Sequence, residues 1–517
     1  MVAELELIKM LASSIAAVGL IGVVVSLYNA LVVKPRRLRS LLTKQGIRGP
    51  PSTLLLGNIM EINKSQARTI TGLAPAGEAP ADHNCSGVLN SLFEQWRRQY
   101  GDVYVFALGN TQVLCVNQPE IVREVTTCTS LDLGKPLFQD LDPLLGQGIL
   151  TSNGTFWAQQ RKILAPELYM DKVKGMMNLI TECAIIMVNS WNSIIETEGG
   201  TADIKIDNHM RSFSGDVISR ACFGSNFSKG EEIFHKIRSL QKLMSKKGFS
   251  FGIPGSSYLP TKINREAWAL EKEVAYLILK VVKEKQEARY KKDLLQMVLE
   301  RAKNGDPHQE ATDRIVVDNC KNVYLAGYET TAVTATWCLM LLAANQNWQD
   351  RVRAEVLQVC KGRSTPDYDM LNKMKQLTMV IHESLRLYPP ATTISREVFT
   401  DMKFGDITVP KGVTIWATVM ALHTDPKIWG PDSYKFNPDR FANGIAGACK
   451  PPYLYMPFGV GPRVCLGQNL AMIELKLLLA LIVSNFSFSL SPKYIHAPAI
   501  RLLLEPEHGV DLLVRKL

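Results

Sequence analysis

The most informative stretch of this sequence is Phe458-Gly459-Val460-Gly461-Pro462-Arg463-Val464-Cys465-Leu466-Gly467, and an amphipathic helical pattern follows it directly. Its glycines and its proline predict a tight loop whose backbone comes close to something bulky. A cysteine at the start of a helix has its thiolate stabilised by the positive end of the helix dipole and by amide groups that point at the sulfur. A lone cysteine in such a turn is more often a buried structural residue, but the whole pattern favours Cys465 as a thiolate ligand to iron.

A second motif, Ala326-Gly327-Tyr328-Glu329-Thr330-Thr331, lies inside a long predicted helix. A glycine in a helix costs about 1 kcal/mol relative to alanine, and threonines compete for backbone hydrogen bonds, so we expect the helix to bend or loosen here. Such a site suits the close approach of a flat ligand. Ala326 and Thr330 share one helical face, where the Thr330 hydroxyl and the Glu329 carboxylate are placed to relay protons. Simple helix packing explains the same residues, and the motif by itself leaves both interpretations open.

Two further pairs carry charge at helical spacing. Glu383 and Arg386 stand three apart on a predicted helix that ends before a Pro-Pro pair, and Arg440 is a possible second partner for the carboxylate. Trp157 and Arg161 stand four apart and are both hydrogen-bond donors, suited to a carboxylate. Each pair also has a common explanation that involves no function. Glu383 and Arg386 fit an exposed ion pair that stabilises by a few tenths of a kcal/mol, and Trp157 and Arg161 fit a cation–π contact.

The composition is that of a folded globular protein, with 46% hydrophobic and 21% charged residues among 517. The ten cysteines are scattered without CxxC pairs, which argues against zinc sites and disulfide frameworks. A net charge of +10 is dispersed along the chain, so we interpret it as a solvated surface and predict no nucleic-acid partner. The exception is a basic cluster that follows an apolar run: Lys34, Arg36, Arg37 and Arg39.

The apolar run extends from Met10 to Val33 without a charge, long enough for a membrane-spanning helix of about 20 residues. A cleaved signal peptide would have a shorter apolar stretch and a basic leading end. The basic cluster behind the run places the N-terminus in the lumen and the body in the cytosol. We therefore expect residues 1–33 to be a lumenal N-terminus and anchor, residues 34–57 a basic, Pro-rich hinge, and residues 58–517 one catalytic domain.

Secondary-structure patterns in the body are mainly helical. Tyr104 to Val116 predicts a β-hairpin around Gly109-Asn110, and Val413 to Val419 a short strand. Helical periods cover Asp171 to Trp191, Glu266 to Ala302, Asp313 to Ala344, Trp348 to Val359, Met374 to Tyr388 and Gln468 to Val483. The predicted fold class is mainly α with a minor β portion.

These motifs, in this order behind an N-terminal anchor, resemble the cytochrome P450 family over essentially the whole chain. The resemblance implies the cytochrome P450 fold and haem b, with Cys465 as the axial thiolate within a cofactor loop that includes Phe458, Gly459, Gly461 and Gly467. It implies that Glu329 and Thr330 are the acid and alcohol pair of oxygen activation. By the same resemblance Glu383, Arg386 and Arg440 form a structural triad, and Trp157, Arg161, Arg396 and Arg463 bind the haem carboxylates. Asp439 stands where many relatives have Glu.

The reaction implied is monooxygenation of a hydrophobic small molecule by O2. No flavin or nicotinamide fingerprint occurs in the sequence, so electrons are expected from an NADPH-dependent flavoprotein reductase, with the enzyme in the endoplasmic reticulum membrane. Alternatives are a haem-thiolate isomerase or dehydratase and a haem sensor. The acid and alcohol pair argues against both, because neither needs a proton relay for oxygen.

Within the family, Ser152-Asn153-Gly154 and Asp318-Asn319-Cys320-Lys321 are similar to the plant branch that oxidises gibberellins, which are tetracyclic diterpenoid acids. Related plant enzymes act on triterpenoids, steroids or alkaloids, so the substrate class stays open at this point. Four mostly apolar segments are expected to face the substrate: Leu131 to Leu150, Asn322 to Thr330, Ala391 to Arg396 and His496 to Ala499.

Overall fold

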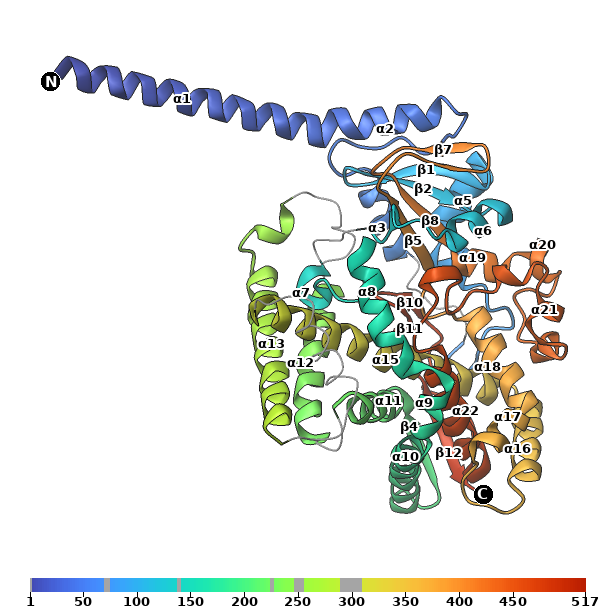
Figure 1. The fold of residues 1–517 in the computed structure, drawn as a ribbon. Helices are drawn as coiled ribbons and strands as arrows, with labels where there is room; N and C mark the ends of the chain where they lie inside the picture. Colours follow the sequence, from blue (N-terminus) through green and yellow to red (C-terminus); the bar gives the residue numbers. More distant parts are fainter. Residues whose placement is uncertain (1, 69–74, 137–140, 224–226, 246–254, 289–308) are drawn as a thin grey trace.

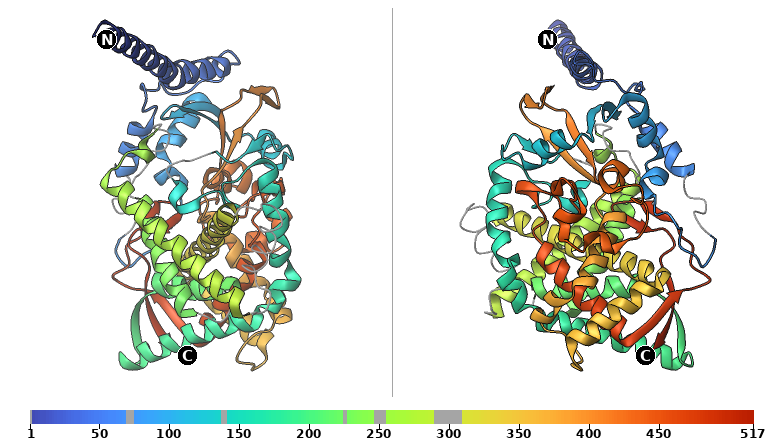
Figure 2. Two further views of the ribbon diagram at one scale, coloured as in Figure 1. Left: turned by 60° about the vertical axis from the view of Figure 1, so that its left-hand side comes forward. Right: turned by 90° about the vertical axis from the view of Figure 1, so that its right-hand side faces the viewer.

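The computed structural model describes residues 2–68, 75–136, 141–223, 227–245, 255–288 and 309–517. It shows a helical body with strands at its margins and one long helix that leaves the body (Figures 1 and 2). The fold class predicted from the sequence, mainly α with a minor β portion, is confirmed.

The projecting helix carries the apolar N-terminal run. α1 (Val2–Tyr28), the π-helical turn η1 (Asn29–Val33) and α2 (Lys34–Thr43) follow one another without a break. Pro35 lies at the start of α2, and because proline has no N–H to donate, a wide turn just before it is the expected accommodation. The stretch Lys9–Thr43 is long and apolar enough to cross a membrane, and none of its most apolar window is buried.

The non-helical connection to the body is therefore shorter than the predicted hinge, because residues 34–43 are helical. Gly49 lies directly against the first strand: a Cβ on it would stand 1.7 Å from the carbonyl oxygen of Val105. The Val105 N–H donates to the Arg48 carbonyl at 3.0 Å. Only glycine permits this approach, which seats the connection on the sheet.

A five-stranded sheet with the order β1-β2-β8-β5-β3 lies beneath this connection. β1 (Val103–Leu108) and β2 (Thr111–Val116) form the predicted hairpin, with Leu108 paired to Thr111 across a turn in which Gly109 has a φ of 59°. β8 (Thr414–Thr418) runs parallel to β2 and confirms the strand predicted near Val413. β5 (Thr393–Val398) and β3 (Leu133–Gly134) complete the sheet.

The other sheets are small. β4 (Thr201–Lys205), β12 (Asp511–Lys516) and β9 (Phe486–Leu490) form a three-stranded antiparallel sheet. Two two-stranded pairs join β6 (Met402–Phe404) to β7 (Ile407–Val409) and β10 (Pro498–Ile500) to β11 (Leu504–Pro506).

The helices predicted from periodicity are present, with shifted ends. They are α9 (Met170–Gly175) with α10 (Met177–Thr197), α13 (Lys262–Ala288), α15 (Gln309–Ala344), α16 (Gln346–Cys360), α18 (Lys375–Leu387) and α22 (Gln468–Asn485). Residues 289–302 of the predicted helix that includes α13 lie outside the described residues. Further helices relevant to the site are α6 (Pro119–Thr127), α7 (Asp142–Leu145), α8 (Gly154–Leu164), α11 (Ile206–Phe223), α12 (Phe227–Ser245) and α19 (Val419–Thr424).

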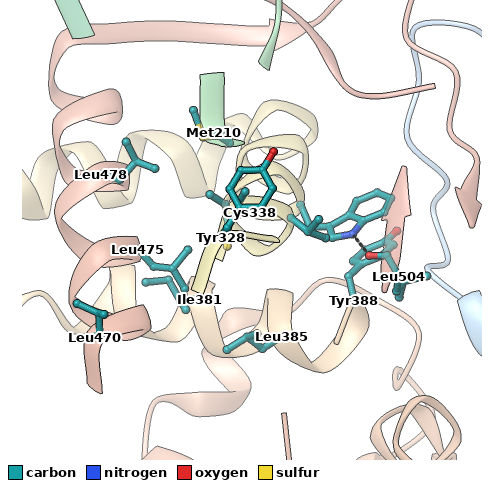
Figure 3. Close-up of a cluster of buried hydrophobic side chains, with 14 of the residues drawn as sticks. Met210, Tyr328, Cys338, Ile381, Leu385, Tyr388, Leu470, Leu475, Leu478 and Leu504 are labelled. Atoms are coloured by element: carbon teal, nitrogen blue, oxygen red, sulfur yellow. Dashed lines mark hydrogen bonds between the residues drawn. The ribbon is translucent and has the colours of Figure 1, made fainter. Parts of the chain in front are cut away.

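The core is built around α15, which crosses the middle of the body (Figures 1 and 2). Figure 3 shows side chains of α15, α18 and α22 packed together, among them Cys338, Ile381 and Leu475. The Trp337 indole N–H donates to the Leu504 carbonyl at 3.0 Å, and its ring stacks on Tyr388 with centroids 4.1 Å apart. α22 is itself apolar enough to span a membrane, but 61% of its apolar window is buried in this core.

Candidate active site

The loop before α22 is held by its own backbone and by α6. The Cys465 N–H donates to the Phe458 carbonyl at 2.8 Å. Gly459 and Gly461 have φ of 72° and 75°, in the left-handed region that favours glycine. A Cβ on Gly461 would stand 2.2 Å from the carbonyl oxygen of Thr126. The close approach predicted for this loop therefore includes an approach to the end of α6.

The Cys465 thiol has the surroundings predicted for it. Its side chain is accessible, yet burial raises the pKa of the Cys465 thiol, while the amides of Gly467 and Gln468 and the charge of Arg161 lower it. Burial is the larger effect, so the pKa of the Cys465 thiol is raised on balance, and the two amides and the Arg161 cation offset part of that rise.

Three of the predicted haem-carboxylate ligands gather beside this loop. Arg161, on α8, donates to the Val464 carbonyl at 3.0 Å. Arg463 lies over the Trp157 ring, 4.1 Å from its centroid. Burial lowers the pKa of Arg463 to about 10, with contributions from the charges of Arg396 and Arg161. Burial alone lowers the pKa of Arg396 to about 10. Trp157 makes the cation–π contact that its spacing also allowed, and its role as a donor stays a prediction.

Lys135 is a fourth cation in this group, and the sequence analysis did not find it. Burial lowers the pKa of Lys135 to about 7, with contributions from Arg396 and Arg463. The Asn153 side chain holds the Lys135 backbone in place by accepting from its N–H at 2.6 Å and donating to its carbonyl at 2.8 Å. Asn153, Arg396 and Arg463 are not neighbours of Lys135 in the sequence, so no local sequence pattern around Lys135 predicted these contacts.

These four cations fit an anionic ligand. Among the described residues, none of Lys135, Arg161, Arg396 and Arg463 forms an ion pair with a carboxylate. Buried like charges without a counter-ion are costly. A flat ligand with two carboxylates, as haem b has, would supply that counter-charge next to an accessible thiol.

Glu329 and Thr330 make different contacts on α15. Glu329 is 3% exposed and accepts from Arg211 of α11 at 3.1 Å, while the same guanidinium donates to Glu505 at 2.8 Å. The Thr330 hydroxyl donates to the Ala326 carbonyl at 2.6 Å, so its own lone pairs stay open to another donor. Neither Arg211 nor Glu505 was expected from the sequence, because they lie on α11 and β11.

A charged cavity of about 780 Å³ reaches Glu329. Its wall includes Arg211, Lys242, Arg501 and Glu505. Burial would lower the pKa of Arg211, but the carboxylates of Glu329 and Glu505 outweigh it and raise the pKa. The cavity therefore joins the buried carboxylate to a polar, charged region.

Gly327 has a different neighbour from the one predicted. A Cβ on Gly327 would stand 2.6 Å from the Ile218 side chain of α11, and the Ser214 hydroxyl donates to the Gly327 carbonyl at 2.9 Å. This glycine brings α11 close to α15, and its expected role beside a flat ligand stays a prediction. The same close packing lets Arg211 reach Glu329.

The predicted triad is present, with one change of partner. Arg386 is fully buried and donates to the Glu383 carboxylate at 2.7 and 2.8 Å. Arg440 lies 3.6 Å from Glu383, beyond hydrogen-bond distance, and donates instead to Asp432 at 2.8 and 3.1 Å. Arg440 lowers the pKa of Asp432, a partner that the sequence analysis missed. Asp439 pairs with Arg351 at 3.0 and 3.1 Å on the surface.

The triad is connected to the cysteine loop through His423 of α19. Arg386 donates to the His423 carbonyl at 2.9 Å, and the His423 Nε2 accepts from the Met456 N–H at 2.9 Å. Burial, and to a smaller extent the positive charge of Arg386, lowers the pKa of His423 to about 3. The neutral ring is the form that can accept from Met456, two residues before the Phe458–Gly467 loop.

The predicted substrate-facing segments fall into three groups. Asn322 to Thr330 lies in α15, and Ala391 to Arg396 leads into β5. Residues 137–140 of the segment Leu131 to Leu150 lie outside the described residues. In the segment His496 to Ala499, His496 is 1% exposed, and its ring contacts the hydroxyls of Tyr494 at 2.7 Å and Tyr388 at 3.4 Å. The role of this segment at the substrate stays a prediction.

Comparison with known proteins agrees with this geometry. The cytochrome P450 family model matches residues 80–511. The chain is 50% identical over 497 residues to "Cytochrome P450 714C2" of Oryza sativa subsp. japonica, covering 95% of each chain. It is 43% identical over 514 residues to "Cytochrome P450 714A2" of Arabidopsis thaliana, covering 97% of each. With a family model that matches most of its length and relatives up to 50% identical over 95% of the chain, this chain belongs to the cytochrome P450 family, the haem b monooxygenases.

Proposed function

We propose that Cys465 is the axial thiolate and that the enzyme inserts one oxygen atom of O2 into a gibberellin or a related tetracyclic diterpenoid acid. The observation that carries the site assignment is the group of four cations without a counter-ion beside the accessible Cys465 thiol. The substrate class rests on the branch-like motifs at Ser152-Asn153-Gly154 and Asp318-Asn319-Cys320-Lys321. A triterpenoid, steroid or alkaloid is the alternative substrate.

The residues around the cofactor have separable roles. The haem, when bound, supplies the oxygen activation, which thiolate donation favours. Arg161, Arg396, Arg463 and Lys135 neutralise its two carboxylates. The amides of Gly467 and Gln468 hydrogen-bond to the Cys465 sulfur and offset part of the burial that raises the pKa of its thiol. Through His423, the buried Arg386 keeps the segment before the loop in position.

Protons enter from the charged cavity in this proposal. Glu329 takes a proton from solvent in the cavity, and the Thr330 hydroxyl passes it toward the oxygen-binding side of α15. Arg211 lies 3.1 Å from the Glu329 carboxylate and supplies the counter-ion that a buried carboxylate requires.

Electrons come from an NADPH-dependent flavoprotein reductase in the same membrane. The anchor places the N-terminus in the lumen of the endoplasmic reticulum and the catalytic domain in the cytosol. The Asn153 side chain supports this orientation, since Asn153 begins a glycosylation sequon. Its amide nitrogen is engaged with Lys135, so a glycan there would break a contact that positions a cation of the site.

The test is reconstitution of the full chain in membranes with the plant reductase, NADPH and O2. Gibberellins, other diterpenoid acids, triterpenoids and steroids are supplied singly, and product masses are measured. A product heavier by one oxygen from a diterpenoid acid, formed only with NADPH, supports the proposal. Conversion without NADPH would identify an isomerase or dehydratase, spectral binding without any product would identify a sensor, and oxidation of triterpenoids or steroids alone would replace the substrate class.

A further inference from the structure

The first half of α15 is fastened to the segment that follows α7. The Gln147 N–H donates to Asp318 at 2.9 Å and the Ile149 N–H donates to Asn319 at 3.1 Å. The Leu150 N–H donates to Asn322 at 2.8 Å. Side chains from almost one turn and a half of α15 thus accept hydrogen bonds from the main chain of a short stretch that starts at the last residue of α7. This stretch is here called the 145–151 segment.

Asn322 is the centre of this attachment. It is fully buried, and besides accepting from Leu150 it donates to the Leu145 carbonyl at 2.6 Å. An amide can accept and donate at once, whereas a carboxylate can only accept and an apolar side chain can do neither. Asn322 therefore holds both ends of the 145–151 segment against α15.

Glycines in the segment are shaped to these side chains. A Cβ on Gly146, which has a φ of 54°, would stand 2.1 Å from the Asp318 carboxylate. A Cβ on Gly148 would stand 2.6 Å from the Asn322 amide. The backbone of the segment therefore lies in direct contact with the α15 side chains. The contact requires glycine at positions 146 and 148, because a larger residue there would collide with Asp318 or Asn322.

A buried lysine orients the Asp318 carboxylate. Lys321 is 1% exposed, with its ammonium 2.9 Å from Asp318 and 3.3 Å from the Pro143 carbonyl of α7. This contact adds α7 to the attachment and satisfies a charge that would otherwise be buried alone.

The chain beyond the segment is fastened to the cysteine loop. Arg463 donates to the Asn153 side-chain oxygen at 3.0 Å and to the Ser152 carbonyl at 3.2 Å. One continuous piece of chain is thus held by α15 at one end and by a neighbour of Cys465 at the other. Both attachments use residues of the two branch-like motifs, Asn153 in one and Asp318, Asn319 and Lys321 in the other.

We propose that Asn322, with Asp318 and Asn319, is a positioning residue that fixes the 145–151 segment as a rigid wall of the substrate site and so determines which carbon is oxidised. The inference rests on the proposed function, since it assumes a fused-ring substrate oriented by the same site. A rigid polycycle selects one carbon only if the wall against which it rests is itself fixed. In this proposal the side chain of Leu150, which is large, apolar and 38% exposed, is the part of the wall that meets the substrate.

The test uses Asn322→Asp and Asn322→Leu of the haem-loaded full chain. Asn322→Asp keeps the acceptor for Leu150 and loses the donor to Leu145, whereas Asn322→Leu loses both. The matched control is Thr336→Val, a substitution of similar size at another buried polar position of α15, where the hydroxyl donates only to Ala332 of its own helix.

Hydrogen exchange measures the attachment without any substrate. Peptides covering the 145–151 segment should exchange about tenfold faster in Asn322→Leu than in the native enzyme, and less so in Asn322→Asp. Exchange in the segment should be unchanged in Thr336→Val. Equal exchange in Asn322→Leu and the native enzyme would refute the attachment.

Product analysis measures the consequence for the reaction. With a tetracyclic diterpenoid acid that the native enzyme oxidises, the ratio of minor to major positional products should rise by about threefold or more in Asn322→Leu. Faster exchange with an unchanged product ratio would refute the positioning role and leave a structural one. If neither Asn322 variant folds, Asn319→Ala, which removes only the Ile149 contact to the segment, gives the same two measurements. If the native enzyme oxidises no diterpenoid, the proposed function fails, while the exchange result still decides the attachment.

Discussion

Replacing Glu383 with glutamine should destabilise the enzyme far more than the same change at Asp432 or Asp439. The reason is the environment of Arg386, whose five N–H groups are all used. Two donate to Glu383, and three donate to the carbonyls of His423, Ser433 and Lys435. Both members of the Glu383–Arg386 pair are fully buried. In Glu383→Gln the guanidinium keeps its charge without a counter-ion, and the new amide turns a donor toward a donor.

The magnitudes follow from burial. Removing one partner of a buried ion pair costs about 3 to 5 kcal/mol. A chain of 517 residues has an unfolding entropy of about 1 kcal/mol per degree, so the unfolding temperature should fall by roughly 3 to 5 °C. Asp432 is 40% exposed on its side chain, so Asp432→Asn should cost about 1 kcal/mol or less despite its hydrogen bonds to Arg440. Asp439 and Arg351 are 54% and 42% exposed, and Asp439→Asn should cost about 0.5 kcal/mol or less.

The assay is loss of the thiolate-type absorption of the reduced carbonyl complex on heating. This band reports the cysteine loop, and the loop depends on Arg386 through His423 and Met456. Three acid-to-amide changes of equal size make a matched series. The reasoning is refuted if Asp439→Asn or Asp432→Asn lowers the midpoint as much as Glu383→Gln does.

Three other predictions follow from the site. Cys465→His should abolish the thiolate-type band, and its survival unchanged would show that another residue ligates the iron. Thr330→Ala should raise NADPH consumption and peroxide release per product, because the relay loses its hydroxyl. The control Thr336→Val should leave both quantities near native values. If Thr330→Ala couples NADPH use to product as well as the native enzyme does, Thr330 is not on the proton path. Burial lowers the pKa of His83 and His423 to about 3 and of His382 and His496 to about 4, so the unfolded chain binds more protons below pH 6.5. The stability that depends on the neutral rings is complete above that pH. It is lost as the pH falls toward 4, by about 1.4 kcal/mol per pH unit for each ring. Unfolding temperatures measured from pH 7 to pH 5 should therefore fall steeply, and an unfolding temperature that stays constant would contradict the burial of these rings.

Local patterns predicted what local geometry determines. The hairpin at Gly109-Asn110, the main helices and the start of a helix just after Cys465 each follow from spacing and turn chemistry within a short stretch. The pairing of Glu383 with Arg386 was predicted for the same reason, because both stand on one face of α18.

Partners from distant elements could not be predicted in this way. Lys135 lies far in sequence from Arg396 and Arg463, and Arg211 lies far from Glu329; nothing in the sequence around Lys135 or Arg211 marks these contacts. The glycines show the same limit more sharply. A close approach was predicted correctly at Gly327 and Gly461, but the neighbours are Ile218 and Thr126 rather than a bulky ligand alone. A glycine in the sequence can indicate that another group packs closely against the backbone, but only the tertiary structure identifies that group.

The unbroken helix from Lys9 to Thr43 has a consequence for how the enzyme meets other proteins in the membrane. Its end is pinned to the body: Gln45 both donates to and accepts from the backbone of Thr408 in β7, each at 2.8 Å, and Arg39 donates to the Pro50 carbonyl. A flexible tether would let the body tumble above the bilayer, whereas a stem fixed at its base restricts tilt and leaves mainly rotation about the membrane normal. In the proposed arrangement, a reductase in the same bilayer then always meets the same edge of the molecule at the same height. Finding a partner then requires only lateral diffusion in the membrane and rotation about the membrane normal.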